Sequence, residues 1–126
     1  MGEKSRILVV EDEPSLRLLV CKVLERNGFQ VMAASSGAEA LELWDHDKPQ
    51  IDLLLTDMVM PDGMSGRQLA ERLKADMPEL KILYTSGYST ELLGKDLELK
   101  EGINFLQKPY PPSKLLQTVR SALGIV

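Results

Sequence analysis

The sequence predicts a single α/β domain in which a parallel sheet of five strands is covered by helices on both faces. Short apolar segments alternate five times with segments whose apolar residues recur at helical spacing. The chain has 126 residues, the length of one ordinary domain, and its hydrophobic fraction of 44% is enough for a core. We therefore treat residues 1–126 as one domain, whose folded core covers about residues 6–123. A doubly wound sheet of this size commonly has the strand order 2-1-3-4-5.

The first strand is predicted at residues 6–10, where RILVV is rich in β-branched residues. A helix is predicted over residues 14–28, because Pro14 suits a first helical turn and Gly28 suits a C-terminal cap. Its apolar residues recur at i, i+3, i+4, i+7 and i+8, which predicts one buried face. That face would consist of Leu16, Leu19, Val20, Val23 and Leu24.

The rest of the chain repeats this alternation. Ser36 and Glu39 form the S-x-x-E pattern of a capping box, which predicts that a helix begins there. The segments SGRQLAERLKAD and PSKLLQTVRSALG again place apolar residues on one helical side. The predicted elements are strand 29–35, helix 37–45, strand 51–57, helix 65–76, strand 81–86, a short helix with an irregular tail within 90–102, strand 103–107 and helix 112–124.

Composition excludes several classes of function. The net charge is −4 and no basic stripe is present, so a nucleic-acid surface is not indicated. No apolar run has the length of a membrane-spanning helix, and the N-terminus shows no cleavable signal pattern, so we expect a cytoplasmic protein. We interpret Cys21 and Trp44 as packing residues and His46 as a solvated surface residue.

Polar residues follow four of the predicted strands. Glu11 and Asp12 come after the first strand, Asp57 ends the third, Ser86 ends the fourth and Lys108 follows the fifth. In the order 2-1-3-4-5, the first and third strands are neighbours, and a crevice opens at their carboxyl ends. The sequence therefore predicts that these five side chains gather at one edge of the sheet.

Clustered acids need compensating charge, because neighbouring carboxylates disfavour each other's ionised form. Mg²⁺ binds oxygen ligands and takes one or two carboxylates together with a phosphate oxygen. An aspartate can attack a phosphoryl group, and Asp57 is the better nucleophile because it stands between the acid pair and the side of Ser86 and Lys108. Glu13 is expected at the N-terminus of the first helix, where the helix dipole favours an acid.

Four stretches, ILVVEDEP, DLLLTDMVMPDGMSG, ILYTSGY and FLQKPY, occur in an order and spacing that resemble the receiver domains of bacterial response regulators. This resemblance covers about residues 6–123 and implies a flavodoxin-like fold. It implies that Asp57 accepts phosphate from a histidine kinase or a histidine phosphotransfer protein. Glu11, Asp12, Asp57 and the backbone carbonyl of Val59 would then hold Mg²⁺, for which Mn²⁺ could substitute, with the contact of Glu11 either direct or through water.

The resemblance also implies an activation switch. Ser86 would bind the phosphoryl group and Lys108 would pair with it, with a cis bond between Lys108 and Pro109. Phe105 occupies the place of an aromatic residue that turns inward on activation, or it is an aromatic residue of an edge strand packed on the sheet. Tyr88, and Val59 near Asp57, would control access to the phosphoryl group, or Tyr88 is only a loop aromatic.

The implied output is a change in the face formed by the fourth helix, the fifth strand and the last helix. The turn PDGMSG is one residue longer than in many receivers, and with LYTSGYS it resembles receivers at the C-terminal end of hybrid sensor kinases. We expect no direct contact with nucleic acid or membrane, and a monomer or weak dimer. The kinase, the stimulus and the downstream partner do not follow from the sequence.

This signalling switch is not expected to be an enzyme, and three other functions fit the sequence less well. An aspartyl-phosphate phosphatase needs D-x-D, but Met58 and Val59 follow Asp57. A flavin or nucleotide carrier needs a phosphate-binding loop after the first strand, where this chain has acids. A degenerate receiver that binds partners without phosphorylation is disfavoured by the complete set of Asp57, Ser86 and Lys108.

Overall fold

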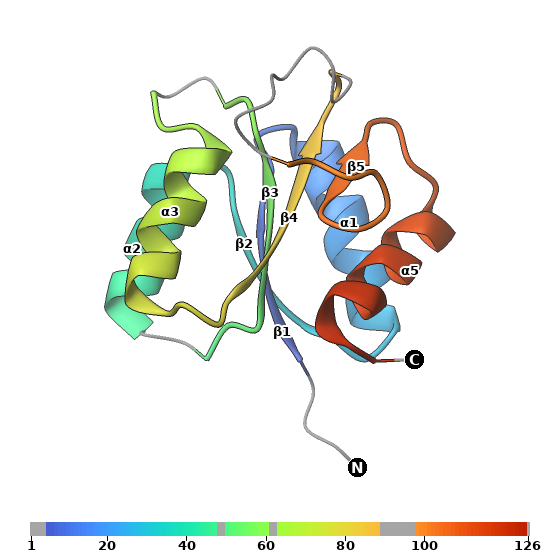
Figure 1. Cartoon of the computed structure of the whole chain (residues 1–126), viewed down its shortest axis with the longest axis horizontal. Helices are drawn as coiled ribbons and strands as arrows, with labels where there is room; N and C mark the ends of the chain where they lie inside the picture. The colour runs from blue at the N-terminus through green and yellow to red at the C-terminus, as the bar shows by residue number, and fades with distance from the viewer. Residues whose placement is uncertain (1–4, 48–49, 61–62, 89–97, 126) are drawn as a thin grey trace.

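A computed structural model describes residues 5–47, 50–60, 63–88 and 98–125 and confirms the predicted fold class (Figure 1). Its five strands form one parallel sheet in the order β2-β1-β3-β4-β5. The strands are β1 (Arg6–Val10), β2 (Gln30–Ala34), β3 (Leu53–Asp57), β4 (Lys81–Ser86) and β5 (Phe105–Gln107). The helices are α1 (Pro14–Arg26), α2 (Gly37–Asp47), α3 (Gly66–Asp76) and α5 (Pro112–Leu123). The short helix expected within 90–102 lies largely outside the described residues.

Helices cover both faces of the sheet, with α1 and α5 packed together on one face and α2 and α3 on the other (Figure 1). Successive residues of β1 point to opposite layers of the core, so Ile7 packs on the α1 and α5 side and Leu8 on the α2 and α3 side. A strand buried on both faces needs apolar residues at every position. This explains the unbroken apolar run that precedes the acids of the first loop.

The buried face of α1 is narrower than the sequence predicted. Val20 and Leu24 are buried and Leu16 is half-buried, but the side chain of Leu19 is 51% exposed. A helix turns about 100° per residue, so Leu19 lies at the margin of the stripe that meets the sheet. The prediction that Leu19 packs inward was wrong.

The helix ends largely follow their predicted caps. Ser65 and Gln68 form a capping box at the start of α3. At the start of α2, Ser36 Oγ accepts a hydrogen bond from the Glu39 amide, 3.1 Å away, but the Glu39 carboxylate accepts from the Ser35 amide. The predicted capping box of α2 is therefore only half present.

Candidate functional site

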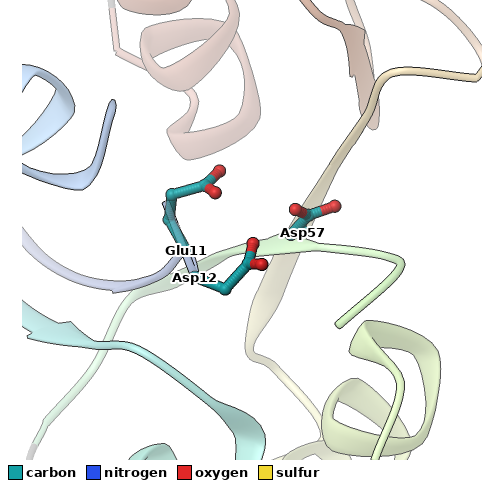
Figure 2. Close-up of side chains that lie close together, drawn as sticks. All are labelled: Glu11, Asp12 and Asp57. Atoms are coloured by element: carbon teal, nitrogen blue, oxygen red, sulfur yellow. The ribbon is translucent and has the colours of Figure 1, made fainter. Parts of the chain in front are cut away.

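Three acidic side chains meet where β1 and β3 end. Glu11 and Asp12 follow β1 directly, and Asp57 is the last residue of β3, which lies next to β1. One carboxylate oxygen from each residue lies within 4.8 Å of the others, and Figure 2 shows the three side chains around one space. The structure therefore brings together the three acids that the sequence singled out.

Lys108 lies between two of these acids. Its Nζ is 2.8 Å from Glu11 Oε1 and 2.9 Å from Asp57 Oδ2. Its backbone amide donates to the Ser86 carbonyl, and the bond to Pro109 is cis, as expected. Burial acts to lower the pKa of Lys108, but the hydrogen bonds to Glu11 and Asp57 outweigh it and raise that pKa above its ordinary value of 10.5.

Glu11 is buried, with both carboxylate oxygens engaged. Oε1 contacts Lys108, and Oε2 accepts a hydrogen bond from the Glu13 amide at 3.0 Å. Burial raises the pKa of Glu11, and although Lys108 and the Glu13 amide act to lower it, the net shift is upward from 4.5. Glu11 therefore carries its charge at a cost that its neighbours only partly offset.

Asp57, like Glu11, is buried. Its Oδ2 accepts from Lys108, and its Oδ1 accepts from the Val59 amide at 3.3 Å. Asp12, in contrast, is exposed. The site therefore combines two buried acids, Glu11 and Asp57, with one exposed acid, Asp12, which forms its open rim.

The third acid of the first loop has a different role, as predicted. Glu13 is the N-cap of α1, and its Oε1 accepts hydrogen bonds from the amides of Ser15 and Leu16. These are two of the amides that a helix leaves unpaired at its start. Glu13 therefore belongs to the helix rather than to the acid cluster.

The predicted switch residues lie near the site but do not all touch it. Ser86 is buried at the end of β4, and its Oγ accepts a hydrogen bond from the Tyr88 amide at 3.0 Å. Its neighbour Thr85 is the register partner of Asp57. Phe105 lies on the edge strand β5 with its side chain fully buried, whereas Val59 and Tyr88 are each 54% exposed.

Two residues of this region were missed by the sequence analysis. Gly66 begins α3 so close to β3 that a Cβ there would lie 2.1 Å from the Asp57 carbonyl oxygen. Its signal was a glycine in a first helical turn, a position that many other residues would suit better. Tyr110 is half-buried, and burial, then the charges of Glu11 and Asp57, raise the pKa of its phenol. The Tyr110 hydroxyl therefore stays neutral beside the acids.

The donor set fits a hard divalent cation. It consists of oxygen ligands only, with two carboxylates fixed by the fold and one on the exposed rim. Mg²⁺ binds through such carboxylates and keeps several waters, which the open rim would admit.

Comparisons with known proteins agree with this geometry. The sequence model of the family described as response regulator receiver domain matches residues 7–120. The chain is 34% identical to the response regulator receiver protein CpdR of Brucella abortus, over 94% of this chain and 96% of CpdR. It is 33% identical to the sensor kinase CckA of the same organism, over 98% of this chain but only 13% of CckA.

Solved structures give the same result. The receiver domain of the hybrid histidine kinase CckA has a TM-score of 0.78 and 32% identity, covering 94% of this chain and 99% of that one. A response regulator receiver protein from Sinorhizobium medicae has a TM-score of 0.83 and 30% identity, covering 97% of this chain and 96% of that one.

None of the helices in the described residues is long and apolar enough to cross a membrane.

Proposed function

Because this chain belongs to the response regulator receiver domain family of two-component signalling, we propose that Asp57 accepts a phosphoryl group in a Mg²⁺-dependent reaction. Receiver domains interact with histidine kinases or phosphotransfer proteins, so the donor would be a phosphohistidine. The observation that carries the proposal is the buried Asp57 carboxylate, which lies 2.9 Å from Lys108 and within 4.8 Å of carboxylate oxygens of Glu11 and Asp12.

The carboxylates of Glu11, Asp12 and Asp57, with the Val59 carbonyl, would hold the Mg²⁺ or a substituting Mn²⁺. When bound, the ion supplies positive charge at the phosphoryl oxygens. Both oxygens of Glu11 already have protein partners, which favours a contact to the metal through water. Asp12 is exposed, so its carboxylate can contact the ion without losing a buried partner.

In the proposed transfer, a carboxylate oxygen of Asp57 attacks the phosphorus atom. A new O–P bond forms as the P–N bond to the donor histidine breaks, and the histidine nitrogen keeps the bonding electron pair. Lys108 already donates a hydrogen bond to Asp57. After the transfer, its ammonium group would contact a negatively charged oxygen of the phosphoryl group. The chain acts here as its own substrate, so we propose a signalling switch and not an enzyme with a separate substrate.

The output would depend on Ser86 and Phe105. Ser86 Oγ would turn to donate a hydrogen bond to the phosphoryl group, and the face that includes β5 and α5 would change its population of conformers. Phe105 is fully buried on β5, and in the proposed switch its side chain would respond to the turn of Ser86. Val59 and Tyr88 are exposed and would limit the access of water to the acyl phosphate.

We also propose that the domain works in the cytoplasm as a monomer or weak dimer, either alone or as part of a longer kinase. Its similarity both to CpdR, which it nearly spans, and to a short part of CckA supports each arrangement.

The test uses acetyl phosphate as a small phosphodonor. The protein is incubated with and without Mg²⁺, and intact mass reports the adduct. We expect one phosphoryl group with Mg²⁺, none in chelator, and none on an Asp57→Asn variant. An Asp45→Asn variant makes the same chemical change at an exposed position of α2 and should label like the parent. An adduct that ignores Mg²⁺ or survives Asp57→Asn contradicts the proposal, and no adduct at all on folded protein favours the degenerate receiver.

A further inference from the structure

We propose that Arg17 is a positioning residue that fixes Glu11 and Asp12 in the orientation a divalent cation requires. The inference rests on the proposed function, because it concerns the same cation site. Arg17 lies outside the acid cluster and is not among the site residues predicted from the sequence.

The contact that carries the inference is made to the backbone. Arg17 lies in the second turn of α1, and its Nη1 donates to the carbonyl oxygen of Glu11 at 2.8 Å. The side chain is half-buried, so this hydrogen bond is partly shielded from water. A hydrogen bond from a charged donor is stronger than one between neutral groups.

The hydrogen bond from Arg17 matters for the site because the Glu11 carbonyl lies in the backbone between two of the acids. The carbonyl belongs to the planar peptide unit that joins Glu11 to Asp12, so its direction constrains where both side chains leave the backbone. Glu11 has further anchors in Lys108 and the Glu13 amide. Asp12 is exposed, so the peptide plane that Arg17 holds is a main constraint on its orientation.

The loop is attached to α1 at both ends of the acidic triplet. The Arg17 backbone amide donates to the Glu13 carbonyl at 2.9 Å, while its side chain reaches back to the Glu11 carbonyl. One residue of the helix therefore spans the loop. Without the guanidinium, repulsion among the neighbouring carboxylates would favour a loop in which the acids separate.

Positioning and simple electrostatics predict opposite results. The guanidinium is a positive charge near a cation site, so removing it should strengthen metal binding if charge alone mattered. If Arg17 positions the ligands, removing it should weaken metal binding. The sign of the change therefore distinguishes the two roles.

The experiment measures Mn²⁺ alone, by the electron paramagnetic resonance signal of the free ion, on the full chain. We expect Arg17→Met to bind Mn²⁺ about tenfold more weakly, as when an outer hydrogen bond that orients a ligand is lost. Arg17→Lys keeps the charge but not the planar fork, so it should lie between the parent and Arg17→Met. Arg26→Met removes an exposed arginine from the last turn of the same helix and should bind like the parent.

Equal or tighter binding by a folded Arg17→Met overturns the inference. If that variant does not fold, Arg17→Lys carries the test, and binding equal to the parent overturns it. A second readout needs no metal, because the Asp12 amide shares the peptide plane that Arg17 contacts. The NMR chemical shift of this amide should change more in Arg17→Met than in Arg26→Met. Equal changes in the two variants overturn the positioning role of Arg17. A parent that binds no Mn²⁺ overturns the proposed cation site and this inference with it, whereas a failure confined to the Arg17 variants overturns only the inference.

Discussion

Residue 66 has no room for a side chain. A Cβ there would lie 2.1 Å from the Asp57 carbonyl oxygen and 2.9 Å from its carbonyl carbon, and both atoms belong to the backbone. The Gly66 amide also donates to the Met58 carbonyl at 3.0 Å, which draws the start of α3 against the end of β3. The glycine is therefore part of what holds Asp57 in place.

A Gly66→Ala substitution should lower the free energy of unfolding by about 2 kcal/mol or more, because backbone must move to admit one methyl group. Urea denaturation measures the change. Gly87→Ala is the matched control, since a Cβ at residue 87 meets nothing within 4 Å and Gly87 is not among the glycines with positive φ. Equal effects at the two positions would show that the close approach at residue 66 is not limiting.

Glu11 provides a prediction about pH. The pKa of Glu11 is raised in the folded protein, chiefly by burial, so the folded state binds this proton more tightly than the unfolded state does. Ionisation of Glu11 then lowers the free energy of unfolding as pH rises from about 4.5 through the folded pKa. Glutamine resembles the protonated form and does not titrate.

The free energy of unfolding of Glu11→Gln, minus that of the parent, should therefore increase between pH 4 and pH 7. Urea denaturation in the presence of a chelator measures both proteins without bound metal. A difference that stays flat or decreases over this range would mean that Lys108 and the Glu13 amide outweigh the burial of Glu11.

The loop between β1 and α1 contributes both to the candidate cation site and to the N-terminal cap of α1. The acids of the first loop divide between the cation site and the cap of the helix, because Glu13 bonds the amides of Ser15 and Leu16. A Glu13→Ala substitution should lower the free energy of unfolding by about 1 kcal/mol, the usual cost of losing an N-cap. Thermal or urea denaturation is the measurement.

Glu25→Ala serves as the control for this cap, because it removes an exposed acid near the other end of α1. Phosphorylation of Glu13→Ala at saturating Mg²⁺ should match the parent, since Glu13 acts on the helix. If Glu25→Ala costs as much stability as Glu13→Ala, the loss reflects net charge and not capping.

The elements themselves were largely predictable, because their hydrophobic periodicity is strong. β4 has the predicted bounds of 81–86, and α5 ends one residue before its predicted limit. β5 is shorter than predicted and begins at Phe105, because strand pairing with β4 reaches only from Tyr84 to Ser86. The apolar periodicity of α1 does not indicate how much of the helix surface the sheet covers. Leu19 was therefore wrongly predicted to be on the buried face.

At the scale of the whole molecule, the site was predictable where it depends on topology alone. The strand order places the ends of β1 and β3 side by side, which brings Asp57 to the acids of the first loop. The Arg17 contact and the Gly66 approach were not predictable, because both depend on distances to backbone atoms of a neighbouring segment. Residue types and spacing do not contain those distances.

The proposed switch predicts a change that is distant in sequence from Asp57. Ser86 Oγ accepts from the Tyr88 amide in this structure, so a hydroxyl that turns to the phosphoryl group should weaken that bond. The Tyr88 amide should then exchange its hydrogen faster in the phosphorylated protein, as measured by NMR. Ser86→Ala should remove the phosphorylation-dependent difference, and the Ala40 amide of α2 should not respond.

Locating the phosphoryl group tests the proposed role of Asp57 directly. The protein is phosphorylated with acetyl phosphate and Mg²⁺ and reduced with borohydride, which converts an aspartyl phosphate to homoserine. Peptide mass spectrometry then identifies the residue. We predict homoserine at position 57 and nowhere else. Homoserine at position 12, or none at position 57 in protein that carries the phosphoryl mass, would be incompatible with Asp57 as the single phosphoacceptor.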